Sequence, residues 1–227
     1  MRNLTAILIA LTLAGAAVLS ARAQSAAMQP GISVAMATTT GAAQLPDADN
    51  PDAWIVTITA NGDLYFGTDR ETSESLLEAM KARPRDRGQG LYIKADGRAP
   101  FSSLKQVLDV ARADLFTIVF LLTAQDTGTP PGSVAPPTGL PILIEPASTA
   151  EAVVVYISPG QGSPRLRIGN EYVPLKVLRR KLVDLLLNPT NRMVILKPGQ
   201  VQFADVAHAV DVCNMVGAVT VMSGAEL

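Results

Sequence analysis

Hydrophobic residues are spaced as in strands and amphipathic helices along most of the chain, and one spacing pattern occurs twice. The stretch LYIKADGRAPFSSLKQVLDVARADLFTIVFLL, Leu91 to Leu122, predicts a strand, a helix with one apolar face and a buried strand. About a hundred residues later, MVILKPGQVQFADVAHAVDVCNMVGAVTVM, Met193 to Met222, predicts the same order. The pattern therefore indicates an α+β fold with a repeated unit.

Each of these stretches follows a predicted hairpin and a further helix. WIVTITANGDLYFG has two alternating patterns around Asn61-Gly62, a strong hairpin signal, and TSESLLEAMKA predicts a helix capped by Thr72 or Ser73. In the second half, AVVVYIS and RLRIG predict a hairpin, and PLKVLRRKLVDLLLN predicts a helix that begins at Pro174. The apolar face of that helix is predicted to hold Leu175, Leu178, Leu182, Leu185 and Leu186.

A constant offset of 102 positions relates the two halves. It takes Gly67 to Gly169, Leu76 to Leu178, Met80 to Leu182, Ile93 to Ile195, Gly97 to Gly199, Phe101 to Phe203, Asp109 to Asp211 and Val110 to Val212. We infer an internal duplication of a β-β-α-β-α-β unit of about 75 residues. Each unit is predicted to form a small mixed sheet with two helices on one face.

The remaining segments complete a predicted domain plan. The basic start, the apolar run Leu4–Leu19 and the sequence Ala-Arg-Ala predict a signal peptide over residues 1–23, or alternatively an N-terminal membrane anchor. An extended approach segment (24–53), a first domain (54–126), a Pro-rich linker (127–150) and a second domain (151–227) follow. Within the linker, PILIE is interpreted as a candidate short edge strand.

Composition narrows the possible functions. The formal net charge is −1, with no basic surplus, so nucleic-acid binding is not expected. One cysteine and one histidine exclude sites built from several such ligands, and we predict no metal, no cofactor and no catalytic activity. We interpret His208 as an ordinary helix residue and Cys213 as a buried small side chain.

Two further motifs favour structural roles over ligand binding. Gly160–Pro164, GQGSP, follows one predicted strand and precedes another, so it is interpreted as a hairpin loop rather than a phosphate site. The basic run Arg179–Lys181 lies on a predicted helix, where a solvated face is favoured over contact with an anionic polymer. Asp96, next to Gly97, is interpreted either as a contact residue or as an Asx-type turn residue.

The order and spacing of the elements resemble the periplasmic domain of the ExbD/TolR biopolymer-transport family. The resemblance is carried by IKADGRAPFSSLKQVLDVARA and by QLPDAD before the first hairpin, with IEPAS in the corresponding place before the second. It implies a non-enzymatic protein that works beside an ExbB/TolQ-like membrane protein and a TonB- or TolA-like transducer. Peptidoglycan is a further implied ligand, and the family's dimers, which form by strand exchange, imply a homodimer or pairing of the two domains within one chain.

The resemblance also has a departure. The family's membrane helix carries an essential aspartate, whereas Leu4–Leu19 holds no acidic residue. We therefore expect an exported, periplasmic accessory or scaffolding protein for energy-dependent envelope transport that binds partners by pairing sheet edges. The alternatives are a peptidoglycan-binding module without a motor, and a protein anchored in the inner membrane by residues 4–19. The candidate partner-contact residues are Lys94, Asp96, Phe101, Lys197 and Phe203.

Overall fold

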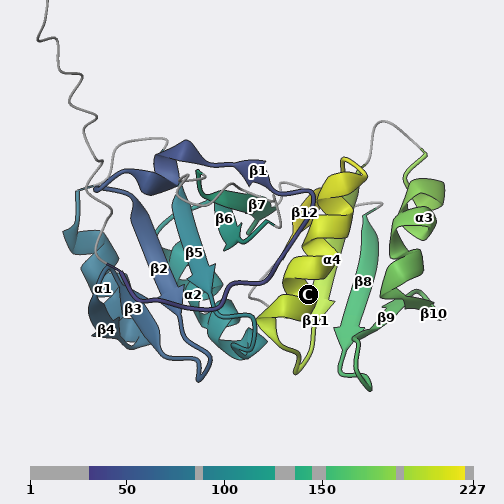
Figure 1. Cartoon of the computed structure of the whole chain (residues 1–227), viewed down its shortest axis with the longest axis horizontal. Coiled ribbons are helices and arrows are strands. Elements are labelled where there is room, and N and C mark those ends of the chain that lie inside the picture. The colour runs from purple at the N-terminus through teal and green to yellow at the C-terminus, as the bar shows by residue number, and fades with distance from the viewer. Residues whose placement is uncertain (1–30, 85–88, 126–135, 145–151, 188–191, 223–227) are drawn as a thin grey trace, which may run out of the picture.

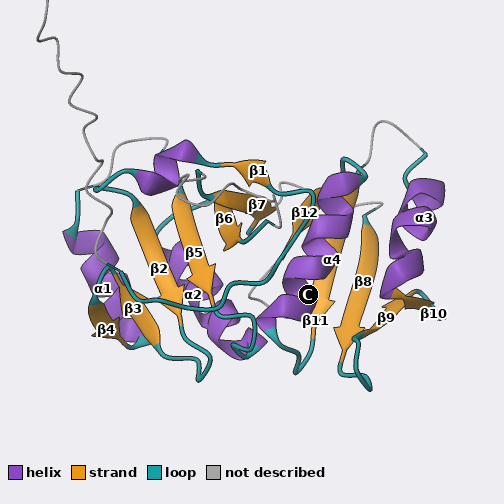
Figure 2. Ribbon diagram, viewed as in Figure 1, coloured by secondary structure: helices purple, strands orange, loops and turns teal. Residues whose placement is uncertain are grey.

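The computed structural model describes residues 31–84, 89–125, 136–144, 152–187 and 192–222. In these residues twelve strands form one continuous mixed sheet that is accompanied by four α-helices (Figures 1 and 2). The predicted combination of a mixed sheet and helices is thus confirmed. The two halves do not form separate sheets, however, because hydrogen-bonded strands connect them.

The first half follows the predicted order closely. Its elements are β2 (Trp54–Ile58), β3 (Leu64–Phe66), β4 (Asp69–Glu71), α1 (Ser73–Ala82), β5 (Leu91–Ala95), α2 (Phe101–Ala113) and β6 (Ile118–Thr123). The Thr72 hydroxyl accepts a hydrogen bond from the Ser75 N–H at 3.2 Å, which confirms the predicted cap of α1. Gly62, in the β2–β3 turn, has a φ of 87°, a conformation that favours glycine.

The second half repeats this order of elements. It contains β8 (Val153–Ser158), β9 (Arg165–Ile168), β10 (Glu171–Pro174), α3 (Leu175–Leu185), β11 (Met193–Pro198), α4 (Phe203–Met215) and β12 (Val219–Val221). In α3, Leu178 and Leu182 are fully buried as predicted. Leu185, predicted on the same face, is instead 44 % exposed, because the helix ends there and only Leu186 turns back to the core.

The strand order is symmetric about β7 (Thr138–Leu143). The sheet runs β10-β9-β8-β11-β12-β7-β6-β5-β2-β3-β4, and β1 (Ala43–Gln44) also pairs with β7. The predicted edge strand within residues 127–150 is therefore a central strand, antiparallel to β6 and parallel to β12. Pro141 is accommodated although it lies within β7 and opposite Phe120.

The constant offset of 102 holds only in part. Gly67 and Gly169 both have positive φ in equivalent turns, and Phe101 and Phe203 both begin a helix. The β8–β9 connection is longer, so the offset falls to 99 between β2 and β8. The offset rises to 103 between β5 and β11. The Asp96 N–H donates to the Ile58 carbonyl, and the Gly199 N–H donates to the Ile157 carbonyl, so Asp96 and Gly199 are equivalent positions. Ile93 therefore corresponds to Leu196, not to Ile195. The common origin of the halves remains a prediction from the sequence.

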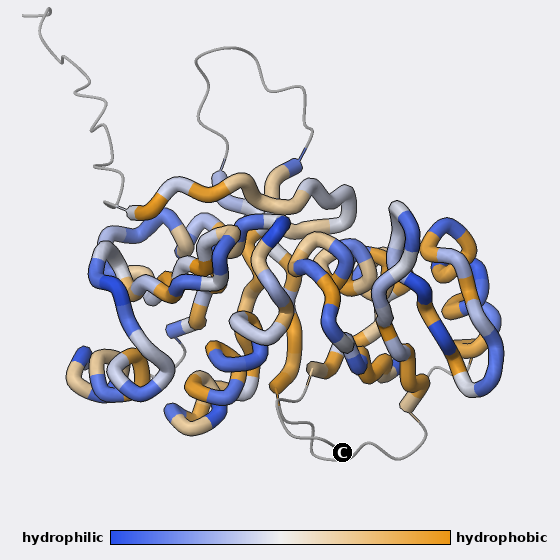
Figure 3. The backbone as a smooth tube through the Cα atoms, turned by 90° about the horizontal axis from the view of Figure 1, so that it is seen from below, coloured by the Kyte–Doolittle hydropathy of each residue, from blue (hydrophilic) through white to orange (hydrophobic). Residues whose placement is uncertain are grey.

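The core extends across both halves. One cluster of buried hydrophobic residues joins strands and helices of the two halves, and hydrophobic and hydrophilic stretches alternate along the helices in Figure 3. A smaller cluster lies on the opposite face of the first half, where Tyr92 and Leu122 pack against Ala48 and Ala53. Ala48 belongs to a short 3₁₀-helix, Pro46–Asp49, that covers this face.

The segment 31–44, which we call the strap, crosses the first half and reaches the second. It forms β-bridges to Asp96 and Ala124 through Met36 and Thr38. The strap and α4 lie on one side of the molecule, and α1 and α2 lie on the other (Figures 1 and 3). Part of the predicted extended approach segment is thus packed onto the sheet.

Candidate functional site

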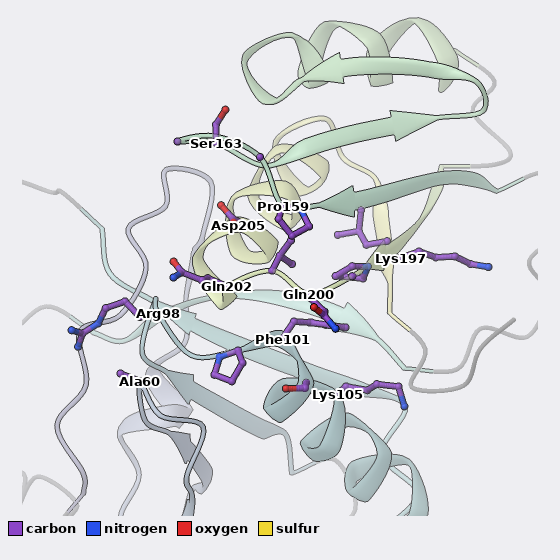
Figure 4. A pocket seen from close by; sticks show the side chains of 18 of the residues that line it. Ala60, Arg98, Phe101, Lys105, Pro159, Ser163, Lys197, Gln200, Gln202 and Asp205 are labelled. Carbon is purple, nitrogen blue, oxygen red and sulfur yellow. The ribbon is translucent and has the colours of Figure 1, made fainter.

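An open cleft of about 1370 Å³ lies where the two halves meet (Figure 4). It is formed by the loops after the parallel strands β2, β5, β8 and β11, so the carboxyl ends of these strands converge on it. Its lining residues are Ala60, Asn61, Arg98, Pro100, Phe101, Ser102, Lys105, Pro159, Gly160, Gly162, Ser163, Ile195, Leu196, Lys197, Pro198, Gly199, Gln200, Val201, Gln202 and Asp205. Loops at the carboxyl ends of parallel strands commonly form binding sites in α/β proteins.

Two loops pair reciprocally beside this cleft. The Phe101 N–H donates to the Val201 carbonyl at 2.9 Å, and the Phe203 N–H donates to the Ala99 carbonyl at 2.8 Å. Pro100 and Gln202 form the antiparallel bridge between these bonds. The β5–α2 and β11–α4 loops thus hold the two halves in a fixed relation at the cleft.

Most charged side chains that line the cleft are basic. These are Arg98, Lys105 and Lys197, and one acid, Asp205, lines the cleft with them. The Arg98 and Lys105 side chains also form salt bridges with Asp96 and Asp109, at 2.9 and 3.0 Å, outside the lining. In Figure 4, the Lys105 and Lys197 side chains come from different elements and extend to the same side of the view, and Arg98 lies on the opposite side.

Asp96 is a buried carboxylate at the end of β5, 4 % exposed. Its Oδ1 accepts hydrogen bonds from the Arg98 N–H at 3.0 Å and the Arg98 Nε at 2.9 Å, and its Oδ2 accepts one from the Ala35 N–H at 3.1 Å. The bond to the backbone of Arg98 confirms the predicted Asx-type turn. The Arg98 side chain, aided by the two backbone donors, holds the pKa of Asp96 well below its usual range.

The strap lies on the first half through further specific contacts. The Lys94 Nζ donates to the Ile32 carbonyl at 3.0 Å, and the Gly97 N–H donates to the Ala35 carbonyl at 2.8 Å. Farther along, the N–H groups of Thr40 and Gly41 donate to the buried carboxylate of Asp211, at 3.0 and 2.7 Å. Polar side chains of both halves therefore hold the strap in place.

The predicted contact residues occupy different environments. Lys94 and Asp96 hold the strap, whereas Lys197 and part of Phe101 line the cleft. Phe203 is fully buried and packs in the core, so its side chain has no surface to offer a partner. Whether any of the five binds a partner remains a prediction.

The remaining candidates have structural surroundings. His208 Nε2 lies 3.1 Å from the Thr38 carbonyl of the strap. Cys213 is buried as predicted, and burial raises the pKa of its thiol to about 12.

The loop Gly160–Pro164 connects β8 and β9, as predicted, but part of it also lines the cleft. In the basic run on α3, the Lys181 Nζ donates to Glu171 at 2.6 Å, and Arg179 and Arg180 are exposed.

Aromatic and basic side chains of β8, β9 and β10 lie together on one face of the sheet in the second half. This face is opposite to the one on which Val155 and Ile157 are buried. The Arg167 guanidinium lies 4.1 Å from the centre of the Tyr156 ring, and that of Arg165 lies 5.2 Å from the Tyr172 ring. Tyr172 is 63 % exposed. This surface, which we call the Tyr/Arg face, reaches the cleft at Lys197, whose ammonium lies 5.8 Å from the Tyr156 ring.

The outer strands are poor templates for a partner strand. The strand β4 has three residues, Asp69–Glu71, all charged, and β10 ends at Pro174. Short, charged or proline-containing edges discourage pairing with another chain. These edges are therefore unfavourable for the predicted mode of binding, by sheet-edge pairing.

Sequence reasoning missed several residues of this region. The sequence relates Asp211 to Asp109 only as a repeat position, and it marks neither Gln200 nor Arg98 as a contact residue. Their proximity depends on how the two halves pack. Among the described residues, no cluster of three or more His, Cys, Asp or Glu side chains is arranged to hold a metal ion.

The fold and cleft define a mixed α/β protein whose candidate site is made by loops at the carboxyl ends of parallel strands. Residues 17–126 match the family model of the biopolymer transport protein ExbD/TolR. This region of similarity to the ExbD/TolR family contains all of the first half from β2 to β6. Members of this family are accessory proteins of biopolymer transport that work with ExbB/TolQ- and TonB/TolA-type partners. No curated protein and no solved structure matches the chain.

The predicted signal peptide or anchor, residues 1–23, lies outside the described residues. Of the helices in the described parts of the chain, none has the length and hydrophobicity needed to span a membrane.

Proposed function

We propose that this protein is an exported accessory or scaffolding protein for energy-dependent envelope transport, and that it acts by binding other proteins rather than by catalysis. The observation that carries the proposal is the ExbD/TolR family match over residues 17–126. It is supported by a loop-lined cleft whose charged groups are Arg98, Lys105, Lys197 and Asp205.

The proposed partners are an ExbB/TolQ-like membrane protein or a TonB/TolA-like transducer. The proposed location is the periplasm, reached by a signal peptide that is cleaved after Ala23, with an inner-membrane anchor at residues 4–19 as the alternative.

We further propose that the halves 54–126 and 151–227 arose by duplication. The shared order of elements and the mirrored order of strands support this proposal.

Affinity capture from cell envelopes tests the partner proposal. The full-length protein, carrying a C-terminal tag, is cross-linked in cells, purified and analysed by mass spectrometry. Enrichment of an ExbB/TolQ-like or TonB/TolA-like protein over a tagged, unrelated exported protein is the expected result. Capture of neither type would remove the support for a role beside a transport motor. The intact mass of the captured protein also reports whether Gln24 is its first residue.

A second candidate function is binding to peptidoglycan, and the Tyr/Arg face favours it. Exposed tyrosine rings and guanidinium groups suit a polymer that carries both sugar rings and carboxylates. Sedimentation with purified sacculi tests this function. A peptidoglycan-binding protein is expected in the pellet, and the double variant Arg167→Glu, Tyr172→Ala is expected in the supernatant. Lys176→Glu, on the exposed surface of α3, is the matched control.

A further inference from the structure

The helices α1 and α3 lie at opposite ends of the molecule and hold equivalent places in the two halves (Figure 1). Each follows the outermost strand of its half, β4 or β10. Leu76 of α1 corresponds to Leu178 of α3, and both side chains are fully buried. Met80 and its counterpart Leu182 are buried in the same way. The offset of 102 therefore holds for these two helices, and their exposed positions can be compared directly.

Exposed hydrophobic side chains gather on α3. Val183 is 49 % exposed, and Leu187, which follows the end of the helix, is 77 % exposed. Val177 and Leu185 are exposed as well. The positions of α1 that correspond to Val177, Val183 and Leu185 are polar or charged: Ser75, Lys81 and Arg83. Helix packing does not account for the apolar residues, because they lie outside the buried face of α3.

Three basic residues lie beside these apolar side chains. Lys176, Arg179 and Arg180 are exposed, and together with Val183 they have the i, i+3, i+4, i+7 spacing of one helix face. In the described part of the chain, the side chains of these three basic residues make no hydrogen bond and no ion pair, whereas the neighbouring Lys181 pairs with Glu171. Exposed aliphatic groups next to unpaired cations distinguish this surface from an ordinary solvated helix face.

The charges of α3 are not those that stabilise a helix. The macrodipole favours acidic residues in the first turn and basic residues in the last. The helix α1 follows this rule, with Glu74 in its first turn and Lys81 in its last. The helix α3 has the reverse arrangement, with Lys176 near its start and Asp184 near its end. The cations near the start of α3 therefore need another explanation, and an anionic ligand supplies one.

We propose that the outer surface of α3 docks on the anionic phospholipid surface of a membrane. Lys176, Arg179 and Arg180 contact headgroup phosphates, and Val183 and Leu187 insert among the headgroups. A fluid layer of headgroups suits this surface, because long unpaired side chains on a single exposed helix can each meet a phosphate without a fixed partner geometry. This inference goes beyond the proposed function, since it concerns a lipid rather than a transport protein.

Co-sedimentation with lipid vesicles tests the proposal. The exported protein is purified as the cell processes it. It is mixed with vesicles of phosphatidylcholine alone, or of phosphatidylcholine and phosphatidylglycerol in equal parts. We expect binding to the vesicles with phosphatidylglycerol to be at least about tenfold tighter. High salt should remove this preference, because it screens the charges.

Matched double variants locate the binding on α3. Each basic residue near an anionic surface contributes roughly fivefold in affinity. Arg179→Gln, Arg180→Gln is therefore expected to bind the vesicles with phosphatidylglycerol about 25-fold more weakly. The control Arg70→Gln, Lys81→Gln removes the same net charge at the other end of the molecule, from β4 and α1, and should stay within about twofold of the native protein.

A pair of leucines tests the apolar contribution. Leu187→Ser is expected to weaken vesicle binding about tenfold. Leu115→Ser changes a similarly exposed leucine in the first half and should leave binding unchanged. Circular dichroism and thermal unfolding show that each variant is folded.

A fluorescent label reports insertion of α3 directly, whatever residues 1–30 contribute to vesicle binding. Cys213 is fully buried, so a thiol-reactive probe labels an introduced, exposed cysteine. An environment-sensitive fluorophore on Val183→Cys should shift its emission to shorter wavelength with the vesicles that contain phosphatidylglycerol, and less with phosphatidylcholine alone. The same fluorophore on Lys81→Cys, the equivalent position of α1, should not respond.

The inference is overturned if the label at position 183 responds no more to phosphatidylglycerol than to phosphatidylcholine, if the label at position 81 responds equally, or if the variants of a matched pair lose the same affinity. An acidic protein is the other occupant. Partner capture from envelopes that is lost in Arg179→Gln, Arg180→Gln, together with an unresponsive label, would assign α3 to that protein. Partner capture that persists beside an unresponsive label leaves the proposed function intact and removes only the lipid site.

Discussion

Phe101 and Phe203 begin equivalent helices, and the backbone N–H of each donates to the loop that precedes the other. The acceptors, Val201 and Ala99, are themselves equivalent positions two residues before the phenylalanines. Such reciprocal bonds are typical of a two-fold interface between identical subunits, in which each partner makes the same contact. Here the relation lies within one chain and joins its two halves at the cleft.

Equivalent positions also reveal a strained residue. Leu115 follows α2 with a φ of 62° and is 82 % exposed, and its equivalent after α4, Gly217, has a φ of 70°. A left-handed conformation costs a residue with a Cβ roughly 1–2 kcal/mol. Leu115→Gly relieves this strain, but glycine also has a larger conformational entropy in the unfolded chain, which offsets part of the gain. We therefore expect Leu115→Gly to raise the free energy of unfolding by about 0.5–1 kcal/mol. Urea denaturation measures this change. Gly217→Ala should lower stability by about 1 kcal/mol. A less stable Leu115→Gly would contradict the strain argument.

The strap should loosen when its buried acceptor on α4 is removed. Asp211→Ala deletes the acceptor of two backbone N–H groups, those of Thr40 and Gly41, and we expect a loss of about 2 kcal/mol in stability. Hydrogen exchange of the amides of residues 38–42 should accelerate more than exchange in β5. The matched control is Asp109→Ala at the equivalent position of α2, where the carboxylate makes only partly exposed ion pairs and its loss should cost under about 1 kcal/mol. Equal exchange in both variants would show that Asp211 does not hold the strap.

The ionisation of Asp96 should make the free energy of unfolding depend on pH in the acid range. Its pKa is lowered in the folded state, chiefly by hydrogen bonds from Arg98. The stabilisation is therefore fully present above the ordinary carboxyl pKa of about 4 and is lost as the pH falls below it toward the folded pKa. We expect the difference in unfolding free energy between the native protein and Asp96→Asn to be constant between about pH 5 and 8 and to shrink below about pH 4. Denaturation across this range measures it. Arg98→Gln should reduce the slope, and a difference that stays constant down to about pH 3 would contradict the assignment.

The central strand should tolerate no side chain at Gly139. A Cβ there would lie 2.7 Å from the Leu121 carbonyl oxygen and 2.6 Å from Leu45 Cδ1. Because the backbone of β6 cannot move away without breaking its pairing with β7, we expect Gly139→Ala to lower the unfolding free energy by about 2 kcal/mol. Thermal and urea denaturation report the loss. Gly199→Ala is the control, since its Cβ would lie at an ordinary 3.4 Å from the nearest atom, and it should change stability by less than about 1 kcal/mol.

The sequence alone determined the local elements of both halves. Period-two alternation predicted the strand around Val56, and the run AVVVYIS predicted the strand around Val155. Helical spacing predicted the buried faces at Leu76 and Leu178. These signals are local, since each depends on which side of a single strand or helix meets the core. The Thr72 cap and the Asp96 turn were predictable for the same reason, because both are formed within a few residues of chain.

The tertiary structure decided everything that depends on distant pairing. The segment Thr138–Leu143 contains a proline and lies in a proline-rich stretch, so its sequence indicated a linker, yet unpaired edges of β6 and β12 make it the centre of the sheet. The shift of register between β5 and β11 is set by hydrogen bonds to neighbouring strands, which no count along the chain reveals. The cleft forms only where loops separated by about a hundred residues meet. Their residues therefore have no common pattern in the sequence, and only the packing of the two halves places Gln200 and Lys197 in one site.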